Sequence, residues 1–123
     1  MKIKLIFDEK EDFLAEFFDT DCVKAIYSIS PIEANLNTWV DEFYFYIPLE
    51  YPLDDTATLK VKAGDIGYWP PGKAIAIFFG STPASVDENP VPASEVNIIG
   101  RLLDDPSRLK ELKKFKKIKI FSL

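Results

Sequence analysis

The stretch GDIGYWPPGKAIAIFFGSTP, residues 64–83, decides the fold of this chain. Pro71 and Gly72 can occupy the second and third positions of a type II turn, because proline presets φ and glycine accepts a positive φ. We therefore predict a hairpin at this point, with strands over residues 66–69 and 74–79. The second strand is apolar at every position, which is typical of a strand buried on both faces or of the inner wall of a barrel.

Residues 42–47 form the clearest alternating strand outside the hairpin. Phe43, Phe45 and Ile47 share one face, and Tyr44 and Tyr46 share the other, as the two-residue period of a strand requires. Weaker patterns predict further strands over residues 1–7, 12–18, 32–38, 56–62, 96–103 and 116–121. We expect the last of these to be an edge strand, because its lysines would discourage pairing with another sheet.

Two short helices are predicted as well. The first spans residues 21–28 after Thr20 as N-cap, and the second follows Asp105 with Pro106 at its first position. Each carries apolar residues at helical spacing: Val23, Ile26 and Ile29 in the first, and Leu109, Leu112 and Phe115 in the second. Cys22 lies beside the first apolar stripe, and we interpret it as a core residue.

These elements assign the chain to the mainly β class, as a closed β-barrel of about eight strands capped by two short helices. At 123 residues and without an internal repeat, the chain is expected to be a single domain over residues 1–123. Residues 81–94 have no periodicity and contain Pro83, Pro90 and Pro92. We expect this segment to be an ordered flap, because proline limits the conformations that are lost on ordering.

Composition excludes several functions. The chain has no histidine, which removes the commonest general base and the commonest transition-metal ligand. Its acidic pairs, such as Asp41-Glu42 and Asp54-Asp55, are neighbours in sequence and would point to opposite faces of a strand, so we predict no metal site and no cofactor. The net charge is −5. Residues 106–123 are basic, and the part of the chain that precedes them is acidic. Nucleic acid is therefore not expected as a partner.

The same composition bears on location. No segment approaches the roughly 20 apolar residues that span a bilayer, and residues 1–7 alternate rather than form a signal peptide. The single cysteine fits a reducing compartment. We expect a cytoplasmic protein that has no membrane partner.

Four strings of sequence carry a resemblance to a known family. They are the 64–83 stretch, Asn37-Thr38-Trp39, Asp41-Glu42-Phe43-Tyr44-Phe45 and Val96-Asn97-Ile98-Ile99-Gly100. Together they resemble the small cyclophilin-like proteins of bacteria and archaea. The resemblance covers most of the chain and implies a cyclophilin-like barrel. It implies no particular reaction, because the family resembles the prolyl isomerases in architecture but has no assigned activity.

A binding groove is the function that the motif residues favour. Aromatic side chains emerge on both faces of barrel strands, and those on the outer face can line a pocket beside the proline-rich flap. We expect the groove to hold a small, mostly apolar molecule or an extended peptide, and we predict no catalytic residue. The aromatic and polar members of the motif strings are its expected lining: Trp39, Glu42, Tyr44, Tyr68, Trp69, Phe79 and Asn97.

Two enzymatic alternatives stay open. One is peptidyl-prolyl cis-trans isomerase activity. The other rests on fold analogy with allophanate-hydrolase subunits, which implies chemistry on a urea- or lactam-like substrate, with Glu42 or Asp41 as the candidate base. The sequence leaves undecided whether a reaction is catalysed, which motif aromatics are core, and the oligomeric state.

The isomerase alternative is weakened by one position. Cyclophilins, as a family, place an arginine in a Phe-His-Arg-Ile-Ile-Pro string ahead of a Gly-Gly-Asp-Phe segment. The comparable residues here are 43–48, FYFYIP, ahead of 63–66, AGDI, which puts Phe45 where the arginine would lie. Phenylalanine has no hydrogen-bond donor. The only arginines are Arg101 and Arg108, so efficient isomerase activity is not expected.

Overall fold

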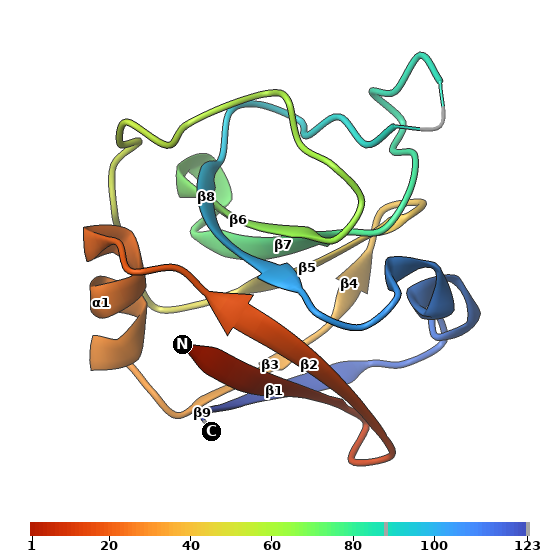
Figure 1. The fold of residues 1–123 in the computed structure, drawn as a ribbon, viewed down its shortest axis with the longest axis horizontal. Helices are drawn as coiled ribbons and strands as arrows, with labels where there is room; N and C mark the ends of the chain where they lie inside the picture. Colours follow the sequence, from red (N-terminus) through yellow and green to blue (C-terminus); the bar gives the residue numbers. More distant parts are fainter. Residues whose placement is uncertain (88, 123) are drawn as a thin grey trace.

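Nine antiparallel strands curl into a nearly closed barrel (Figure 1). The computed structural model describes residues 1–87 and 89–122. The predicted mainly β class and barrel architecture are confirmed. The strands are β1 (Lys2–Phe7), β2 (Glu11–Phe17), β3 (Ile32–Asn35), β4 (Asn37–Thr38), β5 (Glu42–Tyr46), β6 (Asp65–Trp69), β7 (Ala74–Phe78), β8 (Asn97–Leu102) and β9 (Lys117–Ser122).

The barrel closes within one short segment of chain. The strand order is β3-β9-β1-β2-β8-β6-β7-β5-β4, so the two outermost strands are consecutive in sequence and only Leu36 separates them. The predicted strand 32–38 is thus divided into two halves that pair with different neighbours, β9 and β5. The amide of Leu36 still donates to the carbonyl of Lys116 at 2.7 Å, which holds the division in place.

The prediction of an edge strand at the C-terminus is wrong. β9 pairs with β1 on one side and with β3 on the other, because Ile118 and Ile120 are needed in the core. Its lysines lie on the outer face of the barrel rather than along an unpaired edge. Lys119 contacts Glu9 at 2.6 Å and Glu33 at 4.0 Å, so it bridges the neighbouring elements.

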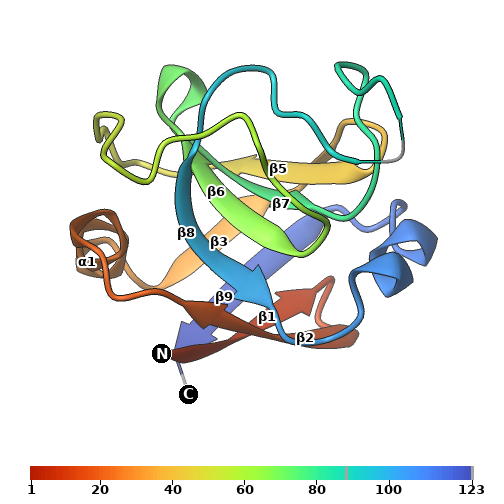
Figure 2. The ribbon, with the colours of Figure 1, turned by 45° about the horizontal axis from the view of Figure 1, so that its top comes forward.

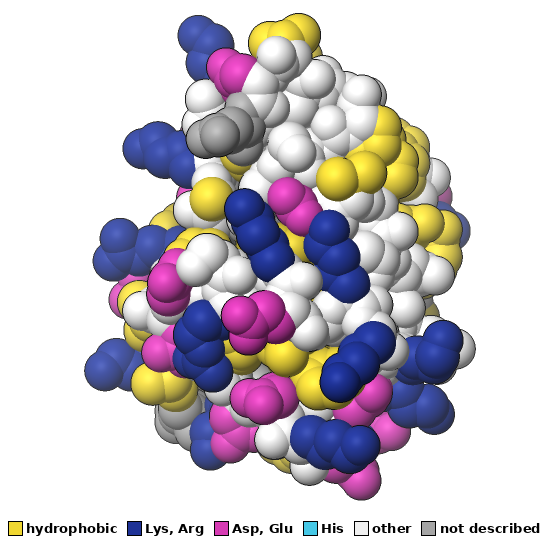
Figure 3. All heavy atoms as spheres, turned by 90° about the vertical axis from the view of Figure 1, so that its right-hand side faces the viewer, with side chains coloured by type: hydrophobic (Ala, Val, Ile, Leu, Met, Phe, Trp, Pro, Cys, Tyr) yellow, Lys and Arg dark blue, Asp and Glu magenta, His cyan; other side chains and the backbone are white. Residues whose placement is uncertain are grey.

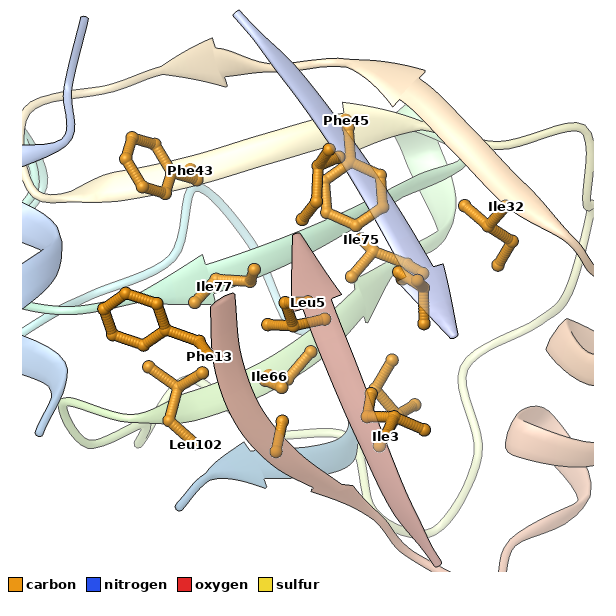
Figure 4. Packing of buried hydrophobic residues seen from close by; sticks show 14 of the residues in the cluster. Ile3, Leu5, Phe13, Ile32, Phe43, Phe45, Ile66, Ile75, Ile77 and Leu102 are labelled. Atoms are coloured by element: carbon orange, nitrogen blue, oxygen red, sulfur yellow. The ribbon is translucent and has the colours of Figure 1, made fainter. Parts of the chain in front are cut away.

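The core fills the barrel from every side. Figure 4 shows Phe43 and Phe45 of β5 beside Ile77 and Ile75 of the neighbouring strand β7, with Leu5 of β1 in the same cluster. These side chains are at most 1% exposed, as the alternation of β1 and β5 predicts. The aromatic rings contact one another, with centroids 4.7 Å apart for Phe43 and Phe79.

Two helices cover opposite ends of the barrel (Figure 1). Helix α1 (Asp21–Ser28) begins as predicted, because the hydroxyl of Thr20 accepts from the amide of Val23 at 3.1 Å. The 3-10 helix η2 (Pro106–Glu111) begins at Asp105, whose side chain accepts from the amide of Ser107, and its Leu109 is fully buried. No helix in the described part of the chain is long and apolar enough to cross a membrane.

The turn of the 64–83 hairpin differs from the prediction. Residues Pro70–Gly72 form a short 3-10 helix, η1, and Lys73 rather than Gly72 takes the left-handed conformation, with φ at 51°. Gly72 has no positive φ, so the predicted type II turn is wrong. Glycine is required here for another reason, since a Cβ atom at this position would lie 2.4 Å from Cζ3 of Trp69. The indole ring of Trp69 lies across the turn.

The predicted strand 56–62 is also wrong. Only Thr58 forms a bridge, to Val96, and the rest of the segment belongs to a long connection. Of its alternating apolar residues, Val61 is buried, whereas Leu59 is 50% exposed. Figures 1 and 2 show this connection and the one after β7 passing over the outer side of β5, β6 and β7. Both faces of β7 are therefore covered, as its apolar sequence predicts.

We expect Phe45→Ala to lower the free energy of unfolding by about 3–5 kcal/mol, because it leaves a cavity in a core that cannot fully collapse. The matched control is Phe121→Ala on β9, where the side chain is 45% exposed and Phe45 is 0% exposed. Truncating the same side chain there should cost less than about 1 kcal/mol. Urea unfolding of both variants measures the difference, and equal losses would contradict the packing described here.

Candidate functional site

A groove lies on the outer face of β5, β6 and β7. The strand register places Tyr44 opposite Ala76 and Tyr46 opposite Ala74, and Ala74 is also paired with Trp69 on β6. Large rings therefore stand on both sides of two small side chains, which leaves a hollow between them. The groove has a volume of about 220 Å³, and its lining residues are Trp39, Glu42, Tyr44, Tyr46, Trp69, Ala74, Ala76, Phe78, Pro92, Ala93 and Val96.

The connection after β7 forms the roof of this groove. Pro92 and Val96 are buried against it, and the indole Nε1 of Trp69 donates to the hydroxyl of Ser94 at 2.6 Å. Val96 can approach because β6 has glycine at the facing position, where a Cβ atom on Gly67 would lie 2.8 Å from the side chain of Val96. The roof is thus attached to the wall of the groove by a hydrogen bond and by close packing.

Among the described residues that line the groove, Glu42 alone has a carboxyl group. Its side chain is 7% exposed, and its Oε1 atom has no hydrogen-bond partner among the described residues. It lies opposite Phe78, beside Trp39 and Tyr44, so its surroundings are mostly apolar. Burial therefore raises the pKa of Glu42 to about 8, because the charged form loses its hydration without gaining a partner.

Asp41, the other candidate base, has a different environment. Its carboxylate contacts the ammonium of Lys113 at 2.6 Å, its backbone N–H donates to the carbonyl of Ser81, and its carbonyl accepts from the amide of Phe79. It does not line the groove. Asp41 thus holds the turn between β4 and β5 in place, whereas its neighbour Glu42 reaches the groove.

Four of the seven residues expected at the site line the groove. These are Trp39, Glu42, Tyr44 and Trp69. The other three do not line it. Tyr68 and Phe79 are 0% and 2% exposed and belong to the barrel core, and Asn97 is fully buried at the start of β8.

Tyr68 and Asn97 have a structural role instead. The hydroxyl of Tyr68 donates to the carbonyl of Leu49 at 2.5 Å. The amide of Asn97 donates to the carbonyl of Pro52 at 2.9 Å and accepts from the amide of Asp54 at 2.8 Å. Both side chains therefore attach the connection between β5 and β6 to the barrel.

Sequence reasoning missed Tyr46, Phe78 and the small residues of the floor. Tyr46 shares its face with Tyr44, which the alternation of β5 already shows. Phe78 shares its face with Ala76, but in a strand that is apolar throughout nothing in the sequence tells Phe78 from Phe79. The turn at Pro70–Gly72 determines which residues of β7 point into the barrel and which point outward. A shift of one residue would exchange the two faces.

Cys22 does not contribute a nucleophile to the site. It is fully buried beneath β8, and burial raises the pKa of its thiol to about 11. The thiol is therefore neutral near physiological pH and unreactive. The interpretation of Cys22 as a core residue is confirmed.

The described residues contain no group of three or more acidic or sulfur side chains that could hold a metal ion. Figure 3 shows one side of the molecule, where Lys and Arg side chains alternate with Asp and Glu. Ion pairs such as Lys113–Asp41 break up the basic C-terminal segment, so this face has no continuous basic patch.

Comparison with known proteins decides the family. A family model described as cyclophilin-like matches residues 1–121. The chain belongs to the cyclophilin-like family. A hypothetical protein from Archaeoglobus fulgidus, solved in solution, is 32% identical and superposes with a TM-score of 0.82, over 100% of this chain and 95% of that one. No curated protein matches.

Glu42→Gln tests the environment of this carboxyl group in the cyclophilin-like barrel. Folded Glu42 binds its proton more tightly than the unfolded chain does, so the free energy of unfolding of the wild type should fall as the pH rises from 4.5 to about 8. The contribution is at most about 1.4 kcal/mol per pH unit. Glutamine does not titrate, and the stability of the variant relative to the wild type should therefore rise across this range.

Urea unfolding of wild type and variant across this pH range measures that difference, in which the titration of all other groups cancels. A difference that stays constant with pH would show that Glu42 is solvated or paired in the folded protein.

Proposed function

We propose that this cyclophilin-like protein is a binding module that holds a small molecule in the aromatic groove, without efficient prolyl isomerase activity. The observation that carries the proposal is the construction of the groove. Five aromatic side chains surround a floor of two alanines, and a single unpaired carboxyl group lies at one end. Ligand sites in proteins typically combine such apolar walls with a few placed polar groups.

The dimensions of the groove favour a small molecule over an extended peptide. Its volume of about 220 Å³ is below the roughly 300–1,000 Å³ of sites for drug-sized ligands. Pro92 and Ala93 cover it from above, so a long chain would have to displace the roof. A ligand with a few heavy atoms fits without rearrangement.

The arrangement of arginines supports the absence of isomerase activity. Phe45, at the position comparable to the cyclophilin arginine, points into the core and is 0% exposed. The described residues that line the groove include no arginine. Arg101 contacts Glu16 at 3.5 Å, and Arg108 contacts Glu11 at 3.8 Å and lies over the ring of Phe13.

Proton transfer by Glu42 is the second candidate function. A carboxyl group with a pKa of about 8 can donate or accept a proton near neutral pH, as a general acid or base must. This is the specific support for chemistry on a urea- or lactam-like substrate. The described lining contains no serine, cysteine or lysine, so Glu42 is the group to which we assign the proton transfer.

The binding function predicts a clear effect of Trp69→Ala. Fragments that bind the wild type should shift the indole resonances of Trp39 and Trp69 in protein-observed NMR. Trp69→Ala should weaken their binding at least about tenfold, because aromatic anchors carry much of the energy of a binding site. Phe121→Ala, which truncates an aromatic side chain outside the groove, should bind as the wild type does. Unchanged affinity of a folded Trp69→Ala variant would place the site elsewhere.

The isomerase question is tested in a protease-coupled assay with an X-Pro peptide. The uncatalysed barrier is about 18–20 kcal/mol, and we expect the slow phase to keep its uncatalysed rate at micromolar protein. Acceleration that is lost in Arg101→Ala would instead assign the activity to that arginine.

A further inference from the structure

We infer that the ligand of the groove is a small organic cation, an alkylammonium that donates a hydrogen bond to Glu42 while its apolar part lies among the aromatic rings. This inference rests on the proposed binding function and specifies the class of ligand. Its basis is the juxtaposition of an unpartnered, 93% buried carboxyl group with five aromatic side chains in one small hollow.

The carboxyl group of Glu42 requires a partner, and the described residues supply none to its Oε1 atom. Lys113, the nearby ammonium that pairs with Asp41, is not part of the groove. No lysine or arginine is found among the described lining residues. A buried acceptor without a donor is costly, and a ligand that brings both a donor and a positive charge removes that cost.

The aromatic residues also favour a positively charged ligand. The faces of Trp, Tyr and Phe rings are electron-rich and attract cations, with tryptophan the strongest of the three. The groove has two tryptophans, and the rings of Tyr44 and Tyr46 stand at 83° to each other, so that they form two sides of a corner. An anionic ligand would be repelled by the electron-rich ring faces at any pH, and by Glu42 where that carboxyl group is ionised.

A neutral apolar ligand would fill the hollow but would leave Oε1 of Glu42 unpaired. A quaternary ammonium would supply the charge but no donor. An ammonium that retains an N–H group supplies both, and its hydrocarbon part can pack against the alanine floor between Tyr44 and Trp69. The volume of the groove limits that part to a group about the size of a cyclohexyl ring.

Binding of a cation is coupled to the loss of a proton from Glu42. Burial holds the carboxyl neutral in the empty groove below a pH of about 8, and the cation stabilises its ionised form. The titratable groups facing it are Tyr44 and Tyr46 on β5. The pKa of Tyr44 is raised, chiefly by burial and then by Tyr46. The described residues of β7 and the roof contribute only alanine, phenylalanine, proline and valine to the lining.

The test uses cyclohexylammonium and its neutral counterpart cyclohexanol as probes in calorimetric titration. An alkylammonium keeps its charge up to a pH of about 10, so the ligand does not titrate in the range used. We expect the cation to bind at least about tenfold more tightly than the alcohol above pH 8. Its affinity should fall about tenfold per pH unit below a pH of about 8, and titrations in two buffers should show the release of nearly one proton at neutral pH.

Glu42→Gln keeps the shape of the side chain and should abolish both the preference for the cation and the proton release. Glu33→Gln on β3 is the matched control, since it removes the same charge outside the groove and should change neither. The proton release of the wild type tests the inference even if Glu42→Gln folds poorly.

Equal affinity for cation and alcohol above pH 8, or unchanged binding of the cation to Glu42→Gln at that pH, would overturn the inference and leave the binding function standing. Failure of both probes to shift the indole resonances of Trp39 and Trp69 would overturn the inference too. The binding function fails separately, if Trp69→Ala retains the affinity of every fragment that the wild type binds.

Discussion

The burial of β7 on both faces is the constraint from which the rest of the structure follows. Its inner residues complete the barrel core, and its outer residues would expose an apolar strip unless other parts of the chain covered it. Rings from β5 and β6 and the two long connections provide that cover. Ala74 and Ala76 are too small to fill the space between the outer face of β7 and the segments that cover it. A groove therefore remains there instead of a second core.

Burial in this groove raises the pKa of Glu42, and it lowers the stability of the folded protein at neutral pH. A carboxyl group in water would be ionised at neutral pH, and in the groove it loses hydration without a compensating ion pair. A glutamine of the same shape would avoid the penalty of ionisation. Side chains that lower stability in this way are commonly found at functional sites, where the rest of the fold sustains them. Asp41, one residue earlier, has an ion-pair partner in Lys113, so it does not carry the same penalty.

The sequence predicts the fold better than the site, for a physical reason. Alternation along β5 identifies its two faces, and it places Glu42 and Tyr44 together on the outer one. Where a strand is apolar throughout, alternation is lost, and Phe79 cannot be told from its neighbour without knowledge of the turn. That turn was itself predicted incorrectly, because the left-handed position falls on Lys73 and not on glycine. Tyr68 shows a further limit, since a hydroxyl can serve a backbone carbonyl in the core as well as a ligand.

The closure of the barrel at Leu36 determines how another chain could attach to it. Within the described residues, the strands with an unpaired side are β3 and β4, of four and two residues, and they meet at one seam. A strand from another molecule finds only short stretches of free backbone at this seam, which offer little template for strand addition. The outer surface of β5, β6 and β7, where the aromatic groove lies, instead presents side chains to other molecules.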